Sequence, residues 1–569
     1  MIDVLAAAVA DRAVLAPDDP AVTALSYPGG RCTGATLSTA ELHSAAGDLA
    51  AAIRERTAPG DRVAILCEHG LDYVIAFLAC LYSARTAVPL FPVTTGRHEQ
   101  RLHAILNDAR PRLSLVSYGA RLPHTEDLPM LGELLAVDVH ARSDSVVLDR
   151  IGPHPAYLQY TSGSTTSPAG VEISHANLRA ALDQLRGSLE VVNHRPLVNW
   201  LPFFHDMGLV FALALPLYTG VHAITLPPAE FAKRPIRWLR ACSDYRAGAT
   251  ASPNFGLALA VSGTSAEQRA ELDLSGLDLL LNGAEPIRAA ALAAFTNTFG
   301  PHGFRHRAHT AGYGLAEATL AVTISAAHAS PICLEFDRTE LSRGRAVPSA
   351  PDGDGVALVD CGMPAGQTMR IVDIETLHPL PDDRVGEIWV QGPNIGAGYA
   401  GLPARTEATF GAVPAGESGS WLRTGDLGFV HDDGLFIAGR LRDTIVIDGG
   451  NHFPADIEAT AAGAAPELRT GHIAAFGIDT GEREILVVVA EARPGQIDAA
   501  DIARRIRTAV SSGHGITPAE VLIVARGAIP KTSSGKVRRG ACRDHYRAGG
   551  FTTVTTNDSR ASLFGIPAE

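Results

Sequence analysis

The alternation of two kinds of apolar run constrains the fold of this chain more than any other feature of its sequence. From about residue 60 onward, runs rich in β-forming residues alternate with Ala- and Leu-rich runs of helical periodicity. This alternation is typical of α/β layers, in which helices cover the faces of a sheet. Strands are expected at 62–66, 86–90, 223–226 and 277–282, and helices at 174–189 and 266–272.

The length of the chain implies more than one hydrophobic core. A chain of 569 residues is too long for a single core, so two or more domains are expected. Short strands separated by Gly, Pro and Asp between about 356 and 440 predict a small β subdomain. We therefore predict a large N-terminal domain over residues 1–441, built from layered α/β subdomains and this β subdomain.

A second, smaller domain is expected after residue 441. Strands at 485–490 and 519–524, with a helix at 499–510 between them, predict a separate α+β domain over residues 442–569. Its tail is rich in Gly, Thr and Ser, and we expect it to be flexible from about residue 549.

Charge and cysteine content exclude several functional classes. The 48 basic and 61 acidic residues give a net charge of −13, which argues against general nucleic-acid binding. The seven cysteines form no Cys-x-x-Cys pair, which predicts a reduced, cytoplasmic protein without disulfides or a zinc site.

The apolar run Tyr73–Ala84 is too short to cross a membrane, so a buried core helix is expected. The N-terminus lacks the basic start of a secretion signal.

A dense run of Gly, Ser and Thr at 161–171 separates a strand-like segment from a helical one. Its backbone N–H groups and hydroxyls can converge on a polyanion such as a triphosphate. The common pattern Gly-x-x-x-x-Gly-Lys-Ser/Thr does not match, because Pro530 and Val537 occupy the first Gly and the hydroxyl positions around Gly535-Lys536. The nucleophile-elbow pattern Gly-x-Ser-x-Gly also fails. We interpret the run as the phosphate loop of another nucleotide-using class.

Four further segments are polar or punctuated by glycine, and each alone is a weak signal. Taken singly, each is more often a turn or a solvated face than a functional site. They are Gly312-Tyr-Gly-Leu-Ala-Glu317, Thr424-Gly-Asp-Leu-Gly428, Gly439-Arg-Leu-Arg-Asp443 and Ile529-Pro-Lys-Thr-Ser-Ser-Gly-Lys-Val-Arg-Arg539.

Three histidines have the spacing of metal ligands. His302, His306 and His309 recur at intervals of four and three residues. Arg305 and Arg307 would repel a cation there, so a surface loop leading to Tyr313 is expected instead.

The order of the phosphate loop and these four segments resembles the adenylate-forming superfamily, which contains acyl-CoA synthetases, firefly luciferase and nonribosomal adenylation domains. The resemblance covers nearly the whole chain, to about residue 547. Finer features are similar to the fatty acyl-AMP ligases: Trp200-Leu-Pro-Phe-Phe-His-Asp-Met-Gly-Leu-Val210, Gly314-Leu-Ala-Glu-Ala-Thr-Leu320, Gly449-Gly-Asn-His-Phe-Pro-Ala-Asp-Ile-Glu458 and Ser512-Gly-His-Gly515.

Two replacements and an insertion also resemble this branch. Most of the superfamily has Lys at the position of Ala169 and Thr at that of Ala316, and these ligases commonly replace both. Extra residues at about 336–363 look like the ligases' insertion, which implies a brace against the N-terminal domain that hinders the rotation needed for CoA chemistry.

The resemblance implies ATP and Mg²⁺ as cofactors, and it implies a role for each matching residue. Glu317 would ligate Mg²⁺, Asp426 would accept hydrogen bonds from the ribose hydroxyls, and Arg440 would approach the ribose and phosphates. Tyr313, between Gly312 and Gly314, would lie on one side of the adenine. Gly283, Ala284 and Glu285 would lie on the other. The β- and γ-phosphates would be held by the loop residues Thr161, Ser162, Gly163, Ser164, Thr165 and Thr166.

The resemblance also implies the groups that act on the acid. Lys536 would bridge the carboxylate and the α-phosphate, which suits a compact ammonium. His205 would sit near the carboxylate, and Arg442, where Asp or Lys is usual, would be the hinge of a mobile C-terminal domain. Candidate walls of an acyl tunnel are Phe203, Phe204, Met207, Gly208, Ser252, Asn254 and Phe255. Any one of these apolar residues is more often simply core.

The implied function is a fatty acyl-AMP ligase that passes its acyl group to an acyl carrier protein acting in trans. Two alternatives stay open. One is a fatty acyl-CoA synthetase, and the other is a catalytically silent homologue that binds nucleotide or lipid. An amino-acid adenylation domain is less favoured, because the acyl-site candidates are apolar.

Overall fold

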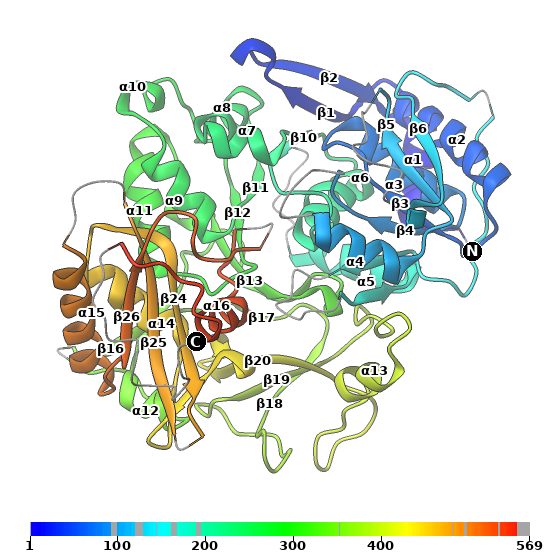
Figure 1. Cartoon of the computed structure of the whole chain (residues 1–569). Coiled ribbons are helices and arrows are strands. Elements are labelled where there is room, and N and C mark those ends of the chain that lie inside the picture. Colours follow the sequence, from blue (N-terminus) through cyan, green and yellow to red (C-terminus); the bar gives the residue numbers. More distant parts are fainter. Residues whose placement is uncertain are drawn as a thin grey trace, which may run out of the picture. The chain divides into compact units, whose positions relative to one another are not determined.

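The chain forms two compact units in the computed structural model (Figure 1). The large unit comprises Met1–Leu334, Ala357–Thr424 and Gly428–Ile437. The small unit comprises Glu335–Val356, Gly425–Leu427 and Ala438–Glu569. The structure describes residues 2–92, 99–119, 129–143, 145–160, 168–188, 195–351, 353–481, 483–493, 498–532 and 535–554, apart from the side chain of Thr470.

The large unit contains a mostly parallel sheet in the order β17-β14-β13-β12-β11-β9-β10-β1-β2. Neighbouring strands from β13 to β1 are parallel, whereas β2, β14 and β17 pair antiparallel. The strands are β1 (Pro20–Ser26), β2 (Thr33–Ser38), β9 (Leu197–Asn199), β10 (Ala223–Thr225), β11 (Ala249–Ala251), β12 (Leu279–Asn282), β13 (His309–Gly314), β14 (Ala321–Ile324) and β17 (Met363–Pro364).

A second sheet of the large unit has the order β6-β5-β3-β4-β7-β8. It is parallel except for the β7–β8 pair, which flanks the predicted phosphate loop. Its strands are β3 (Arg62–Ile65), β4 (Thr86–Pro89), β5 (Leu113–Ser117), β6 (Glu133–Val137), β7 (Tyr157–Tyr160) and β8 (Gly170–Ile173). The strands predicted at 62–66, 86–90, 223–226 and 277–282 are all confirmed to within two residues.

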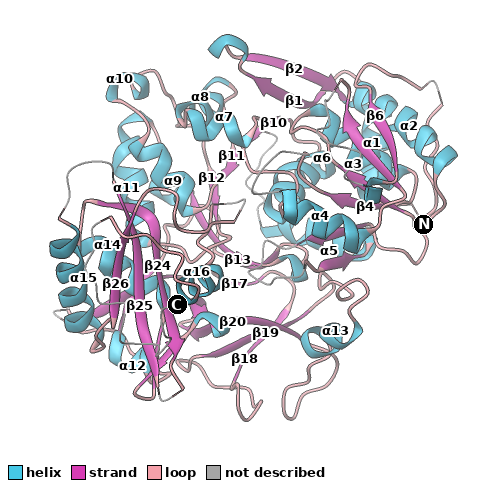
Figure 2. Cartoon of the chain, in the orientation of Figure 1, coloured by secondary structure: helices cyan, strands magenta, loops and turns pink. Residues whose placement is uncertain are grey.

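Helices flank both sheets, as expected for an α/β protein (Figure 2). The predicted core helix is α3, and every residue in it except Asp72 is buried. Within the described residues no helix is long and apolar enough to cross a membrane. The helices of this unit are α1 (Val4–Leu15), α2 (Thr39–Arg56), α3 (Leu71–Tyr82), α4 (Glu99–Ala109), α5 (His175–Ser188), α6 (Leu215–Thr219), α7 (Pro228–Lys233), α8 (Ile236–Asp244), α9 (Asn254–Ser262), α10 (Ala266–Arg269), α11 (Ala289–Phe299) and α13 (Pro403–Phe410).

The predicted β subdomain contains a four-stranded sheet in the order β18-β19-β20-β21. It consists of β18 (Thr368–Val372), β19 (Gly386–Gln391), β20 (Leu422–His431) and β21 (Gly434–Arg440). Residues 355–359 and 363–364 form strands of other sheets, while Asp360 between them forms an isolated bridge with Phe436 of β21. Strand β16 (Gly355–Val359) pairs with β15 (Cys333–Asp337), and β17 pairs with β14.

The main sheet of the small unit has three strands and is buried on both faces. The sheet has the order β24-β25-β26, and alternate residues of β25 enter two different hydrophobic clusters. Burial on both faces explains why this strand reads as a continuous apolar run. The elements are α12 (Arg338–Ser342), β22 (Ile445–Ile447), β23 (Gly450–His452), α14 (Pro454–Ala464), β24 (Leu468–Asp479), β25 (Glu484–Ala492), α15 (Ala499–His514), β26 (Glu520–Val524) and α16 (Arg539–Arg547).

The tail prediction is wrong for residues 549–554. Phe551 is buried in the cluster with Phe476 and Tyr546, and the Val554 N–H donates to the Ile523 carbonyl at 2.9 Å. The apolar Phe551 anchors a segment whose composition is otherwise typical of a mobile end. Residues 555–569 lie outside the described part of the chain.

The N-terminus is fixed by a buried aspartate. Asp3 Oδ1 accepts the N–H groups of Leu5 and Ala6 at 2.9 and 3.0 Å, which caps α1. Its second oxygen lies 2.7 Å from His175 Nδ1 on α5, and both side chains are buried. Asp3 therefore links the first helix to α5, the helix that follows β8.

Replacing Asp3 by alanine is expected to destabilise the large unit by about 2–4 kcal/mol. The lost cap contributes about 1 kcal/mol, and the unpaired buried His175 contributes about 1–3 kcal/mol. Thermal unfolding of the purified protein measures the effect, with the exposed Asp18→Ala as a matched control. Equal melting temperatures for Asp3→Ala and Asp18→Ala would contradict this expectation.

Candidate active site

Four predicted site segments meet at one edge of the large parallel sheet. Strands β9, β11 and β12 end directly before 200–208, 252–255 and 283–285, and β13 itself ends at 312–314. Because these four strands are parallel neighbours, their carboxyl ends lie along the same edge. Ligands of α/β sheets bind outside this edge. The structure thus brings together residues that are more than one hundred positions apart in the sequence.

The predicted adenine segments are held close by glycine. Asn282 is opposite Ala311 in the register, so Gly283 continues beside Gly312. A Cβ on Gly283 would lie 2.7 Å from the Gly312 carbonyl oxygen, which excludes any side chain there. Ala284 adopts a left-handed φ of 68°. This turn redirects the chain after β12 and places Glu285 beside α9.

Glu285 and Asn254 hold the edge of the sheet together. Glu285 Oε1 accepts the Phe255 N–H at 3.0 Å. Asn254 Nδ2 donates to the Pro286 carbonyl at 2.7 Å, and its Oδ1 accepts the Arg288 N–H at 3.2 Å. The Asn254 amide therefore braces the loop after β12, a role that the sequence did not suggest. Its tunnel role, like that of Ser252, stays a prediction.

The segment after β9 is mostly buried. Phe203 is 2% exposed and stacks on His69, with ring centroids 4.1 Å apart. Burial lowers the pKa of His69 to about 3, so the stacked imidazole is neutral. Phe204 packs edge-on against Phe91. His205 is only partly buried, and its Nδ1 lies 2.6 Å from Asp206 Oδ1.

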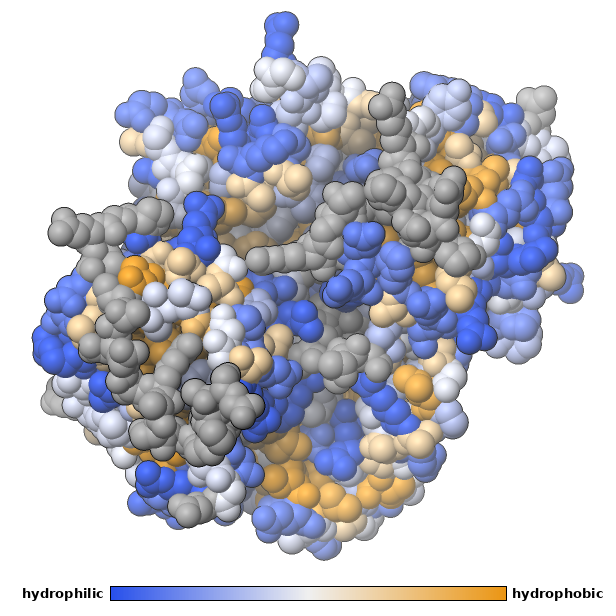
Figure 3. Space-filling model, viewed as in Figure 1, coloured by the Kyte–Doolittle hydropathy of each residue, from blue (hydrophilic) through white to orange (hydrophobic). Residues whose placement is uncertain are grey.

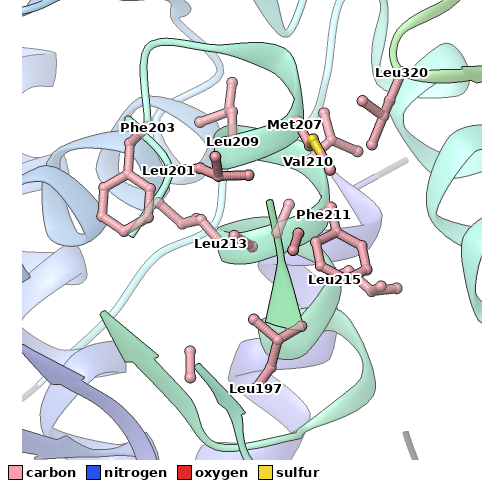
Figure 4. Packing of buried hydrophobic residues seen from close by; sticks show 14 of the residues in the cluster. Leu197, Leu201, Phe203, Met207, Leu209, Val210, Phe211, Leu213, Leu215 and Leu320 are labelled. Atoms are coloured by element: carbon pink, nitrogen blue, oxygen red, sulfur yellow. The ribbon is translucent and has the colours of Figure 1, made fainter. Parts of the chain in front are cut away.

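A π-helix, η5 (Met207–Ala214), follows His205, and all of its residues are buried. Figure 4 shows the side chains of Phe203, Met207 and Leu209 within the main hydrophobic cluster of the large unit. A Cβ on Gly208 would lie 2.0 Å from the Pro202 carbonyl oxygen, so only glycine fits the close turn. π-Helical turns often mark functional sites, because the widened turn redirects side chains.

The phosphate-loop candidates 161–166 lie outside the described residues, and the structure describes the residues on both flanks. On the approach, Gln159 Nε2 donates to the Phe204 carbonyl at 2.9 Å, and Tyr160 Oη donates to Asp108 at 2.6 Å. On the exit, Ala169 is buried and Gly170 lies against the Tyr160 ring. Hydrogen bonds therefore hold the strand before the loop, and the bond from Gln159 connects it to the segment that bears His205.

Glu317 is held by a residue that the sequence reasoning missed. Tyr399 Oη donates to Glu317 Oε1 at 2.8 Å. Burial, and next the Glu317 charge, raise the pKa of Tyr399 above its usual range, so the phenol keeps its proton. The backbone of Tyr399 forms a bridge with Val171 in β8. Tyr399 thus links the predicted metal ligand to the strand that leaves the phosphate loop.

The surroundings of Glu317 fit Mg²⁺. Its carboxylate is half-buried, and the ion prefers carboxylate and phosphate oxygens, with few protein ligands when a nucleotide is bound. Tyr313, 9% exposed, and Gly314 precede it at the end of β13. A Cβ on Gly314 would lie 1.8 Å from the Leu320 carbonyl oxygen, so the turn bearing Glu317 requires glycine.

Two of the three spaced histidines, His306 and His309, contact the same threonine. His306 Nδ1 and His309 Nε2 lie 2.9 and 3.2 Å from the Thr296 hydroxyl. The surface-loop prediction is wrong for His309, which is 1% exposed in β13. Burial, followed by the effect of His306, lowers the pKa of His309 to about 3.

In the small unit, Asp426 in the middle of β20 and Arg440 at the end of β21 form an ion pair. Arg440 Nε lies 3.0 Å from Asp426 Oδ1, and the Asp426 side chain is 8% exposed. Gly425 has a left-handed φ of 69°, which turns the strand just before Asp426. Arg442, the predicted hinge, lies in the short helix η9 (Leu441–Asp443).

Lys536 lies on a tight loop of the same unit. Its N–H donates to Thr532 Oγ1 at 3.0 Å, and its carbonyl accepts the Thr532 N–H at 2.8 Å. Gly535, with a φ of 83°, makes the turn before the lysine. The Lys536 backbone is therefore fixed by its own loop.

Comparisons with known proteins agree with this architecture. The AMP-binding enzyme family matches residues 9–400, and the AMP domain of the Disco-interacting protein 2-like family matches residues 442–556. FadD32, a long-chain-fatty-acid–AMP ligase of Mycolicibacterium smegmatis, is 40% identical over 88% of this chain and 87% of its own. FadD21 of Mycobacterium tuberculosis, named a putative fatty-acid–CoA ligase, is 37% identical over 96% of this chain and 98% of its own.

A solved structure is also similar. The fatty acyl-adenylate ligase of Legionella pneumophila, in complex with acyl adenylate and pyrophosphate, has a TM-score of 0.74 and 32% identity. The match covers 95% of this chain and 96% of that one. On this evidence the chain belongs to the AMP-binding enzyme family, in its fatty acyl-AMP ligase branch.

Proposed function

We propose that this protein activates a fatty acid with ATP, forming an acyl-adenylate and pyrophosphate. It then transfers the acyl group to the phosphopantetheine thiol of an acyl carrier protein acting in trans. The observation that carries the proposal is the 40% identity to a long-chain-fatty-acid–AMP ligase across 87% of that relative. The convergence of four site segments on one sheet edge supports it.

The first step joins two anions. A carboxylate oxygen of the acid attacks the α-phosphorus, and the bond to the pyrophosphate oxygen breaks. Enzymes promote such a step by orienting the reactants and by stabilising the developing charge. In our proposal Lys536 bridges the carboxylate and the α-phosphate, and His205 lies near the carboxylate. Asp426 and Arg440 hold the ribose, while residues 161–166 hold the β- and γ-phosphates.

Glu317 would hold the Mg²⁺, which neutralises phosphate charge when it is bound. Tyr313 would lie against the adenine, opposite residues 283–285. Arg442 would serve as the hinge that brings Lys536 to the nucleotide. The insertion at 336–363 would restrain that motion and disfavour CoA chemistry. We also propose a cytoplasmic location, where free carrier proteins are available.

Replacing Tyr399 by phenylalanine is expected to raise the half-saturating Mg²⁺ concentration by about tenfold, since groups that orient a metal ligand typically contribute 10- to 100-fold. The ring and its packing against Phe410 would be kept, and the hydroxyl that donates to Glu317 is lost. Mn²⁺ binding in the presence of ATP, followed by electron paramagnetic resonance, measures the effect independently of turnover. An unchanged metal affinity would contradict the positioning role.

An assay with several acceptors tests the function. The protein is incubated with ATP, Mg²⁺ and saturated acids of graded length, with no acceptor, with CoA, or with a holo-carrier protein. We expect acid-dependent pyrophosphate release and an acyl-adenylate, followed by acyl-carrier thioester, detected by mass spectrometry. An arylalkanoic acid belongs in the panel, because aromatic rings lie close to Ser252. Trp200 stacks on Phe231 and packs edge-on against Phe255.

The second candidate is a fatty acyl-CoA synthetase, which the name of the FadD21 relative favours. Efficient formation of CoA thioester would establish it. Absence of pyrophosphate release with every acid would instead indicate a homologue that only binds ligand.

A further inference from the structure

The guanidinium of Arg539 connects the hinge segment with the end of the Lys536 loop. Arg539 lies three residues after Lys536, at the first position of α16. Its Nε and Nη2 donate to the two carboxylate oxygens of Glu458 at 2.7 and 2.8 Å. Its Nη1 lies 3.4 Å from Asp443 Oδ2. Because Asp443 directly follows Arg442, one side chain contacts both the hinge region and the α14 helix.

Glu458, the partner of Arg539 in this contact, is itself held in place. Glu458 on α14 is 4% exposed, and its Oε1 also accepts the Ala475 N–H of β24 at 3.1 Å. A bidentate pair between arginine and carboxylate fixes the orientation of the guanidinium as well as its distance from the carboxylate. Burial opposes the charge of Arg539, but Glu458 and then Asp443 raise its pKa above the usual range, so the guanidinium stays protonated.

The loop that bears Lys536 is held at both stems. At its start, the Ile529 N–H donates to Glu491 Oε1 at 3.0 Å, and Glu491 is fully buried. Across the loop, Lys531 forms a bridge with Val537, and the Arg538 N–H donates to the Pro530 carbonyl at 3.0 Å. Arg539 follows at once. The far stem is therefore anchored by the Arg539–Glu458 pair.

We propose that Arg539 is a positioning residue for adenylation, which couples the Lys536 loop to the hinge through Asp443. Motion at the hinge would then carry the lysine as part of one rigid body. The proposal rests on the proposed function, in which Lys536 acts on the α-phosphate. A displacement of about 1 Å in a reacting group can lower a rate about 100-fold, so a loosely held loop would slow catalysis.

The test compares three variants of the full-length protein. Arg539→Gln is expected to lower kcat for acid-dependent pyrophosphate release by about tenfold or more, with KM for ATP changed less than about twofold. Asp443→Asn, which keeps the Arg539–Glu458 pair, should lower kcat with little change in melting temperature. Arg547→Gln, exposed on the same helix, serves as the matched control and should behave like the wild type.

A charge-matched double variant separates positioning from stability. Glu458→Gln/Arg539→Gln removes both charges, so its melting temperature should recover toward the wild-type value. If kcat stays low in this variant, the positioning role is supported. If kcat recovers together with the melting temperature, or if Asp443→Asn has wild-type kcat, the role is overturned. A wild type that releases no pyrophosphate would instead overturn the proposed function, and this proposal with it.

Discussion

Replacing Lys536 by alanine is expected to lower acyl-adenylate formation at least about 100-fold, while ATP still binds. Removal of one preorganised group that stabilises transition-state charge typically costs 10²- to 10³-fold in kcat. The lysine lies on the small unit, whereas the proposed adenine and metal residues lie on the large unit. Ground-state nucleotide affinity should therefore change little. Single-turnover formation of acyl-AMP and equilibrium binding of an ATP analogue measure the two quantities separately.

Lys531→Ala provides the control for this experiment, because it removes the same charge from the same loop. The Lys531 backbone bridges to Val537, and this pairing does not depend on the side chain. The control should retain adenylation within a few-fold of the wild type. Near-normal adenylate yield from Lys536→Ala would mean that another group approaches the α-phosphate.

The second large effect is expected from Glu317→Gln, which should lower adenylation by about 100-fold at a fixed Mg²⁺ concentration. The amide preserves the shape of the side chain and can still accept the Tyr399 hydrogen bond, but it removes the negative charge that a hard cation prefers. Part of the loss should return at high Mg²⁺. Initial rates across a Mg²⁺ titration measure both effects.

The exposed Glu407→Gln, in the same unit, controls for the loss of one carboxylate. Equal Mg²⁺ dependence of Glu317→Gln and Glu407→Gln would remove Glu317 from the metal site. Together with Tyr399→Phe, these variants distinguish a metal ligand from the residue that orients it. Loss of Glu317 removes a negative charge, whereas loss of the Tyr399 hydroxyl removes only a hydrogen bond to that ligand.

Much of the fold could be predicted because its signals are local. The strands around Val63, Ala87 and Ile224 are short apolar runs, and the periodicity of the helix at His175–Ser188 is contained within the helix itself. The sheet edge that gathers the site also follows from sequence order, since glycine-rich or polar segments come directly after predicted strands. Figure 3 shows hydrophilic areas with apolar patches between them on the face in view.

Contacts between distant side chains could not be predicted. Tyr399 and Glu317 are 82 positions apart, and Arg539 and Glu458 are 81 positions apart. Neither pairing leaves a periodic trace in the sequence. The same holds for the two backbone partners of the Asn254 amide, the Pro286 carbonyl and the Arg288 N–H. Phe551 is a different case. Its burial holds a segment whose Gly- and Thr-rich composition predicts flexibility.

The strand order of the large sheet has a consequence for synthesis on the ribosome. β1, near the N-terminus, pairs with β10, and the opposite end of the sheet is closed by β17 at Met363–Pro364. At about 5–20 residues per second, the early strands wait tens of seconds for their last partners. Unpaired strand edges are prone to aggregation during that interval. A low concentration of unfinished chains, or the presence of a chaperone, should therefore raise the yield of folded protein.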